Sequence, residues 1–191
     1  MNEQLRIEIN KCLPVLQAGG IFVYPTDTLW GIGCDATNET AVEKIFNLKK
    51  RNVSQSMIVL VSSEGMLQRF VKEVPAIAWD LIECAAHPLT IIYPQAARLA
   101  QGVSHADGTV GIRVTKDEFC SALITRLGKP IVSTSANLSG QPAPPSFSEI
   151  DPVILSSVDY VVNLRRQEES PGRPSSIIKV GTGGQIQILR K

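Results

Sequence analysis

A short apolar run that ends abruptly in polar residues is the feature that most constrains how this chain can fold. Residues 21–24 are β-branched or aromatic, which is typical of a buried strand. Pro25 cannot donate to a continuing ladder, and a Thr-Asp-Thr triplet at 26–28 follows it directly. Since open α/β sheets bind ligands at the ends of their strands, this strand end is predicted to present polar groups to a ligand. The alternative is that the triplet only closes a turn, because Asp and Thr side chains bond to nearby backbone amides.

Helical patterns alternate with short apolar runs along the rest of the chain, which is the signature of an α/β fold. Thr40 and Glu43 are expected to form a capping box at the start of the second helix. No Pro- or Gly-rich segment is long enough to be an interdomain linker, so we expect one domain over residues 1–191. Helices are predicted over residues 5–16, 40–48, 66–70, 76–85 and 117–127, with a broken helix over 146–155. Further strands are predicted over residues 57–61, 89–93, 109–114, 131–132, 158–164, 175–180 and 185–189.

Charge, cysteine and hydropathy patterns exclude several classes of protein. The chain has 19 Lys and Arg against 18 Asp and Glu, so its net charge of +1 cannot supply the field of a dedicated nucleic-acid binder. The four cysteines are widely spaced and only two histidines are present, so no metal site is predicted and the thiols are expected to be buried or half-buried. No apolar run reaches the ~18 residues that span a membrane, and Glu3 and Glu8 interrupt the N-terminal segment where a signal peptide would be apolar. We therefore expect a cytoplasmic protein.

A cationic triplet, residues 49–51, ends the second predicted helix. It can serve merely to complement the negative end of the helix dipole from solvent. Residues 52–56, with Gln55 among them, then supply amide and hydroxyl groups before the next strand. A cationic helix end followed by such donors suits a polyphosphate. The residues alone allow both interpretations.

Two other strands bring polar groups into a buried setting. Residues 133–140 carry four hydroxyls and one amide directly after a buried strand, as either a serine-rich turn or a ligand loop. Within residues 109–114, strand alternation places Gly111 and Arg113 on one face, so a guanidinium stands in the middle of a sheet. Arg113 needs an anionic partner. This partner is either an internal carboxylate or a ligand carboxylate, which a planar fork beside a glycine would hold well.

Motifs for several common chemistries are missing. The sequence has no G-x-x-x-x-G-K-[ST] loop, no G-x-G-x-x-G after a strand, no G-x-S-x-G elbow and no H-E-x-x-H pair. Residues 181–184, reading GTGG, are not followed by a helix and are predicted to form a hairpin turn. Neither histidine is flanked by a convincing nucleophile and carboxylate, so a hydrolytic triad is not supported. The side chains that are present favour an enzyme that positions its substrates and neutralises their charge over one that uses covalent catalysis.

Six motifs are spread over nearly the whole chain: GIFVYPTDTLWGIG at 20–33, Lys-x-Arg at 49–51, PLTIIY at 88–93, TVGIRV at 109–114, STSANLSGQP at 133–142 and SSIIKV at 175–180. In this order and spacing they resemble the YrdC-like family, the catalytic domain of threonylcarbamoyl-adenylate synthases. The resemblance implies a twisted, mixed, partly parallel α/β sheet flanked by helices and curved around a basic concave cavity.

The resemblance also implies a reaction, in which L-threonine, bicarbonate or CO2 and ATP give threonylcarbamoyl-adenylate and pyrophosphate for threonylcarbamoyladenosine in tRNA. Lys49 and Arg51 would then be catalytic, because they neutralise the triphosphate as charge moves toward pyrophosphate. Mg²⁺ is expected to be carried mainly by ATP, and no dedicated general base is expected. Expected partners are tRNA or double-stranded RNA and a threonylcarbamoyl-transferase protein. The implied threonine-binding residues are Thr28, Arg113, Ser133 and Ser175, and the implied ATP-binding residues are Lys49, Arg51, Gln55, Thr109, Ser135 and Asn137.

The chain departs from the family pattern at four positions. Asn52 and Ser56 stand where many members have proline, and His87 stands where the family has glycine. Leu60 replaces a histidine that would contact threonine. Because both the Lys-x-Arg and the Ser-x-Asn pairs are present, we place the chain with the synthases. The alternatives are a double-stranded RNA or tRNA-binding module and a nucleotide-binding regulatory protein that does not adenylate threonine.

Overall fold

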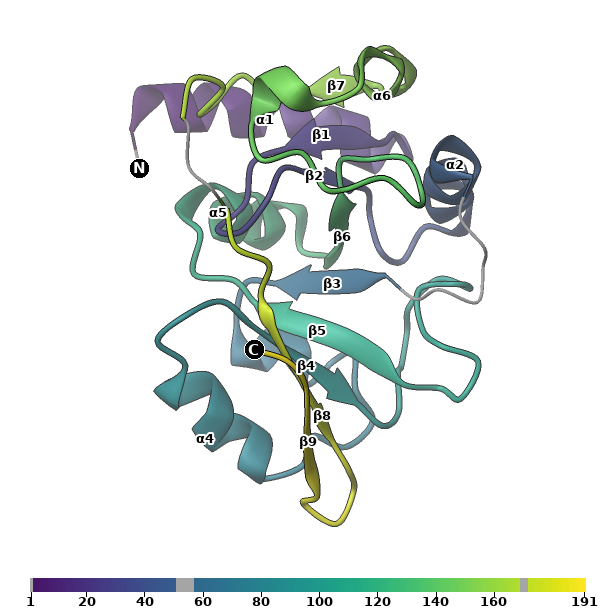
Figure 1. Ribbon diagram of the computed structural model, residues 1–191, viewed down its shortest axis with the longest axis vertical. Helices are drawn as coiled ribbons and strands as arrows, with labels where there is room; N and C mark the ends of the chain where they lie inside the picture. Colours follow the sequence, from purple (N-terminus) through teal and green to yellow (C-terminus); the bar gives the residue numbers. More distant parts are fainter. Residues whose placement is uncertain (1, 51–56, 169–171) are drawn as a thin grey trace.

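One mixed sheet organises the molecule. The computed structural model describes residues 2–50, 57–168 and 172–191, and within these ranges nine strands pair in the order β7-β1-β2-β6-β3-β5-β4-β8-β9 (Figure 1). Three pairs are parallel, β1 with β7, β3 with β5 and β4 with β8, and the other five are antiparallel. The predicted mixed, partly parallel sheet is therefore confirmed. The strands are β1 Phe22–Tyr24, β2 Gly31–Gly33, β3 Ile58–Val61, β4 Leu89–Tyr93, β5 Val110–Val114, β6 Ile131–Ser135, β7 Tyr160–Val161, β8 Ser176–Val180 and β9 Ile186–Arg190.

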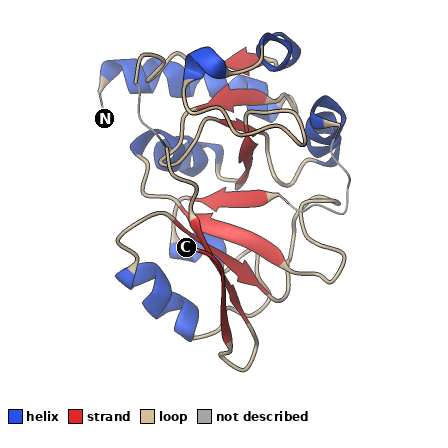
Figure 2. Cartoon of the chain, in the orientation of Figure 1, coloured by secondary structure: helices blue, strands red, loops and turns tan. Residues whose placement is uncertain are grey.

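Helices surround this sheet. The helix α1 packs against α5 and β1, while α3 packs against β3 and β5. Figure 2 shows α1, α2 and α6 at the end of the molecule that holds β1 and β7, and α4 at the opposite end. None of the helices in the described ranges is long and apolar enough to cross a membrane. The helices are α1 Glu3–Gln17, α2 Glu39–Lys49, α3 Glu64–Leu67, α4 Ile77–Cys84, α5 Glu118–Leu127 and α6 Pro152–Ser157, with a 3-10 turn at Phe147–Glu149.

The two best-predicted helices form for the reasons that their sequences suggest. An apolar stripe at helical spacing on α1, which includes Ile9 and Leu16, is buried against the sheet. The carboxylate of Asp117 accepts a hydrogen bond from the Cys120 amide and so caps α5. Gly128 ends α5 with a left-handed φ of 71°. Both helix positions are confirmed.

The structure differs from the sequence-based prediction at several places. The helix predicted over 66–70 lies at Glu64–Leu67, and the strand predicted over 158–164 shortens to Tyr160–Val161. Asn38, not Thr40, caps α2, because its side-chain oxygen accepts from the Ala41 amide at 3.0 Å. The strand β6 extends three residues into the segment predicted to be a loop, as far as Ser135, because β2 and β3 pair with it on both sides. Residues 31–33, which were not predicted as a strand, form β2 because they pair with β1 and β6. Gly33 permits this close pairing, since a Cβ there would approach the Val132 carbonyl oxygen to 2.5 Å.

The four cysteines are free thiols, and they divide into two groups. Cys12, Cys34 and Cys120 are buried, as predicted, whereas Cys84 at the end of α4 is exposed. Burial raises the pKa of the Cys12 thiol to about 12, which is typical of an unreactive core residue.

A buried glutamate fastens α1 to the segment around β7. One carboxylate oxygen of Glu8 accepts from the Tyr160 hydroxyl and from the Asn163 amide, both at 2.7 Å. The other oxygen lies 2.9 Å from the ammonium of Lys11. Burial alone would raise the pKa of Glu8, but the Asn163 amide, the Tyr160 hydroxyl and Lys11 together lower it.

Replacing this carboxylate should lower stability in a pH-dependent way. Glu8→Gln should cost about 1–3 kcal/mol at neutral pH, because the amide cannot satisfy all three donors. Since the folded-state pKa of Glu8 lies below its ordinary value of 4.5, the contribution of its ionised form is present above that pH and is lost as the pH falls through the folded value. Melting temperatures of both proteins across pH 3–7 check this, and the gap between them should close at the acid end.

The matched control is Glu3→Gln on the same helix, whose side chain is 73 % exposed and pairs with Arg6. This change should move the melting temperature little at any pH. A gap between wild type and Glu8→Gln that stays constant down to pH 3 would contradict the assigned role of the carboxylate.

Candidate active site

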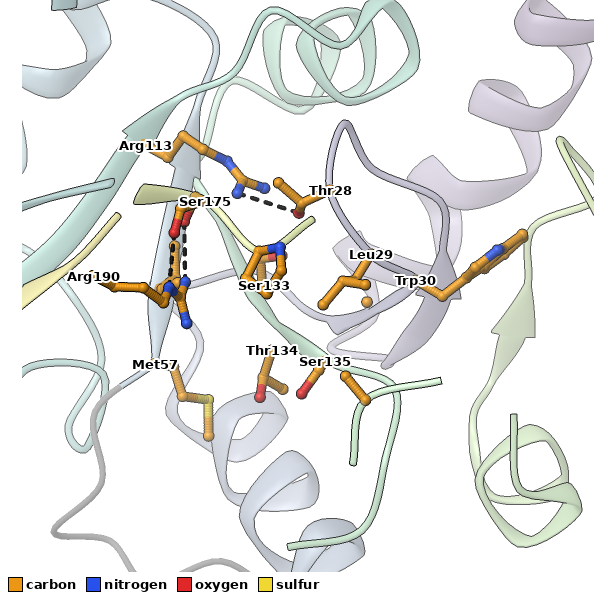
Figure 3. Close-up of a pocket in the computed structure, with 14 residues that line it drawn as sticks. Thr28, Leu29, Trp30, Met57, Arg113, Ser133, Thr134, Ser135, Ser175 and Arg190 are labelled. Atoms are coloured by element: carbon orange, nitrogen blue, oxygen red, sulfur yellow. Dashed lines mark hydrogen bonds between the residues drawn. The ribbon is translucent and has the colours of Figure 1, made fainter. Parts of the chain in front are cut away.

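A cavity of about 300 Å³ opens where the ends of several strands meet the loop between β1 and β2. Its walls come from β3, β5, β6 and β9 and from the segment that leads into β8, so residues far apart in the sequence face one another (Figure 3). The lining is mixed, with hydroxyl and guanidinium groups beside apolar side chains. The polar side chains of the lining are Thr28, Arg113, Ser133, Thr134, Ser135, Ser175 and Arg190.

The loop between β1 and β2 combines both roles considered for its Thr-Asp-Thr triplet. The Thr26 hydroxyl accepts from the amides of Thr28 and Leu29 and donates to the Leu29 carbonyl, so Thr26 closes a turn. This turn directs Thr28 into the cavity (Figure 3). The two interpretations of the triplet therefore both hold, because the turn formed by Thr26 places Thr28 at the cavity.

Arg113 reaches the cavity from near the end of β5 and is 3 % exposed. Its Nη1 donates to the Thr28 hydroxyl at 3.3 Å, and its Nη2 lies 3.1 Å from Oδ1 of Asp27. The internal carboxylate that the sequence left as an alternative is therefore present. Even so, within the described residues Nε of Arg113 has no hydrogen-bond partner. A buried guanidinium with an unused donor beside a cavity is suited to an incoming carboxylate.

Asp27 is held at this position at an electrostatic cost. Burial raises the pKa of its carboxyl group, and the neighbouring charge of Arg113 only partly offsets that effect. Asp27 lines two adjacent hollows and not the main cavity. Gly111, which the sequence placed beside Arg113 as a clearing for a ligand, is also absent from the lining of the main cavity.

Two serines complete the wall around Arg113. Ser133 lines the cavity from β6. The Ser175 hydroxyl pairs with the Thr90 hydroxyl at 2.8 Å, just before β8 begins. The structure thus brings together Thr28, Arg113, Ser133 and Ser175, the four residues predicted to bind threonine.

Arg190, which was not predicted from the sequence, adds a second guanidinium to the cavity. Its Nε donates to the Ser175 carbonyl at 2.8 Å, and Nη2 lies 3.4 Å from the Ser175 hydroxyl (Figure 3). Burial, followed by the positive charge of Arg113, lowers the pKa of Arg190. In the sequence, Arg190 is only one cation at the end of an otherwise uncharged strand, β9. Its place in the cavity becomes evident only when β8 is paired with β4 and β9 with β8. Two guanidiniums in one hollow favour an anionic ligand.

Lys49 lies deeper than those other predicted nucleotide contacts that the structure describes. It is 2 % exposed at the end of α2, and its ammonium donates to the carbonyl oxygens of Ser135 and Asn137. The carbonyl of Lys49 in turn accepts from the Ser139 amide at 3.1 Å. The Lys-x-Arg motif is therefore joined to the Ser-x-Asn motif, and Lys49 fixes the end of β6 where Ser135 enters the cavity.

The remaining predicted ATP contacts are distributed differently. The Asn137 amide donates to the Leu138 and Gln141 carbonyls and stabilises the turn after β6. Thr109 does not line the cavity, and its hydroxyl donates to Asp107 at 2.7 Å. Arg51 and Gln55 lie outside the described residues. The described ranges contain no cluster of three or more His, Cys, Asp or Glu side chains that could hold a metal ion.

Comparisons with known proteins agree with this architecture. The family model Sua5/YciO/YrdC, described as "Telomere recombination", matches residues 14–191. A curated threonylcarbamoyl-AMP synthase from Xanthomonas euvesicatoria is 34 % identical over 96 % of this chain and 97 % of its own length. A second curated threonylcarbamoyl-AMP synthase, from Xanthomonas axonopodis, is 32 % identical over the same shares.

Solved structures show the same fold. The P. abyssi Sua5 complexed with L-threonine superposes with a TM-score of 0.80 at 25 % identity, over 94 % of this chain. The present chain spans about half of that longer protein, 52 % of its length. E. coli YciO superposes with a TM-score of 0.81 at 24 % identity, over 100 % of this chain and 91 % of its own. The family match over most of the chain, the curated relatives and the shared fold together show that this chain belongs to the Sua5/YciO/YrdC family.

Proposed function

We propose that this protein is a threonylcarbamoyl-AMP synthase, which converts L-threonine, bicarbonate or CO2 and ATP into threonylcarbamoyl-adenylate and pyrophosphate. The observation that carries the proposal is the buried guanidinium of Arg113, which lines the cavity with a donor to spare beside Thr28 and Ser133. The names of the curated relatives and the threonine complex of P. abyssi Sua5 support the same reaction. The reaction class would be nucleotidyl transfer.

The chemistry requires that two anions be held together. The free amine of threonine adds to CO2 and loses a proton, which gives a carbamate. A carbamate oxygen then attacks the α-phosphate of ATP, and the bond to pyrophosphate breaks. We assign the threonine carboxylate to Arg113, with Thr28, Ser133 and Ser175 around the amino acid. The enzyme's contribution is proximity and the exclusion of water from an unstable intermediate.

The nucleotide is assigned to the wall formed by β6 and β9. Arg190 offers a guanidinium to the phosphates, and Lys49 holds the Ser135–Asn137 segment in place. The family resemblance adds Arg51 and Gln55 to the nucleotide contacts, whereas Thr109, which it also implies, lies outside the cavity lining. Mg²⁺ prefers to keep several waters, so we expect it to arrive with ATP and to be coordinated mainly by phosphate oxygens. We further propose that the protein acts in the cytoplasm and passes its product to a threonylcarbamoyl-transferase that modifies tRNA.

The direct test is ATP-dependent release of pyrophosphate. We expect release only when threonine and bicarbonate are both added, because the carbamate is the nucleophile. Arg51→Ala should abolish the release while the circular dichroism spectrum stays that of the wild type. Calorimetry that shows ATP binding without threonine-dependent pyrophosphate would instead favour a regulatory nucleotide-binding protein. RNA binding that falls steeply with salt would favour an RNA-binding module.

A further inference from the structure

The guanidinium of Arg113 needs a neutralising partner that leaves the cavity free. Its side chain is 3 % exposed, and a guanidinium buried without a partner is strongly unfavourable. Yet a partner placed inside the cavity would compete with any substrate carboxylate. The partner must therefore lie on another side of the guanidinium.

Asp27 meets this requirement. Across the part of the chain that the structure describes, it is the one carboxylate in an ion pair with Arg113, with Oδ1 3.1 Å from Nη2. It faces hollows of about 330 Å³ and about 260 Å³ beside the main cavity and is not part of that cavity's lining. Asp27 can thus hold one amino group of the guanidinium while the other, Nη1, reaches Thr28 on the cavity wall.

The loop that carries Asp27 is itself held in place. Arg165 forms an ion pair of 2.8 Å with Asp117, the residue that caps α5, and its Nη1 reaches the Thr26 carbonyl at 3.5 Å. These contacts tie the loop between β1 and β2 to the start of α5. Asp27 therefore extends from a fixed support and not from a free loop.

We propose that Asp27 is a positioning residue for threonine binding, which aims the Arg113 guanidinium into the cavity. The inference rests on the proposed function, since it assumes that Arg113 holds the threonine carboxylate. A long arginine side chain has many rotamers, and a partner that selects one of them in advance removes an ordering cost from substrate binding. Asp27 touches neither substrate in this arrangement and acts through Arg113.

Kinetic constants for both substrates test the proposal. Asp27→Ala should raise KM for threonine by about tenfold or more and leave KM for ATP within about twofold, because only the threonine contact loses its orientation. Asp27→Asn should rescue little of this rise, because the 3.1 Å contact between Oδ1 and Nη2 is an ion pair without a hydrogen bond, and asparagine carries no charge. An unchanged KM for threonine in Asp27→Ala, or equal changes for both substrates, overturns the proposal. Full rescue by the neutral asparagine also overturns it.

If Asp27→Ala alone folds poorly, the proposal can still be tested by comparing Arg113→Leu with the double variant that also carries Asp27→Ala. With Arg113→Leu already present, Asp27→Ala should cause no further rise in KM for threonine, because its effect passes through Arg113. The double variant leaves neither charge of the pair unpartnered, so it avoids the main cause of misfolding. Additive effects would show that Asp27 acts independently and would overturn the inference.

Two controls separate this inference from the proposed function. Asp35→Asn alters another buried carboxylate, which pairs with Lys129 at 2.6 Å and does not line the cavity, and it should leave both KM values unchanged. If Arg113→Leu weakens threonine use and Asp27→Ala does not, the proposed function stands and the inference fails. If Arg113→Leu does not affect threonine use, the assignment of Arg113 fails first.

Discussion

Leucine at position 113 should raise the threonine concentration required for half-maximal pyrophosphate release by about 100-fold or more. The change removes a charge-assisted fork, and hydrogen bonds to a charged group contribute about 1.5–3 kcal/mol each, so two of them account for an effect of this size. The requirement for ATP should change by only about threefold, because threonine alone is assigned to this guanidinium. Initial rates measured while each substrate is varied in turn give both values.

Two companion variants exclude simpler explanations for this result. Arg113→Lys keeps the charge but loses the planar fork, so it should fall between wild type and the leucine variant. Arg113→Leu also leaves the carboxylate of Asp27 buried without its partner, and adding Asp27→Asn should recover much of any lost stability. Equal losses for threonine and ATP in the stabilised double variant would remove Arg113 from the threonine site.

Methionine at position 49 should reduce both stability and catalysis. Lys49→Met keeps a chain of similar length but leaves the carbonyls of Ser135 and Asn137 without their buried donor. The Asn137 carbonyl is then unsatisfied, whereas the Ser135 carbonyl keeps the Asn137 amide at 2.9 Å. One unsatisfied carbonyl costs about 1–3 kcal/mol, and a chain of this size loses roughly 2–4 °C of melting temperature per kcal/mol. The end of β6 should then shift, and pyrophosphate release should fall by about 100-fold or more. Thermal melting and single-turnover assays measure the two effects.

The neighbouring lysine supplies the control. Lys50 is exposed at the C-cap of α2, so Lys50→Met removes the same charge without removing a buried donor. It should change the melting temperature and the turnover little. If Lys49→Met matches Lys50→Met in both measurements, the ammonium of Lys49 is not needed to hold the Ser-x-Asn segment.

Much of the site could be predicted from sequence because its polar residues lie where strands end or at alternating strand positions. Thr28 follows β1, and strand alternation brings Arg113 onto a wall of the cavity. The contribution of Arg190 could not be predicted, because it depends on β8 and β9 pairing beside β4. The sequence predicted that Arg113 could pair with an internal carboxylate, but it did not identify Asp27. A sequence alone does not show which acidic residue lies beside a buried arginine.

The local errors have two different physical origins. Thr40 and Glu43 fit a capping box, but the chain enters α2 two residues earlier, through Asn38. Ser133 and Ser135 have low intrinsic strand preference, yet pairing with β3 and β2 keeps them in the ladder. In β6 the surrounding tertiary structure outweighed a local preference, whereas at α2 the local cap formed by Asn38 replaced the one predicted at Thr40.

The position of Arg190 on the last strand has a consequence for biosynthesis. A nascent chain that has emerged from the ribosome only as far as β6 already contains Thr28, Arg113 and Ser133, but it lacks the wall that β8 and β9 supply. Pairing across such a sequence separation is slow compared with local helix formation. Ligand capture should therefore begin only after the hairpin of β8 and β9 has been synthesised and has paired with β4, which makes the site a product of folding that follows the synthesis of β6.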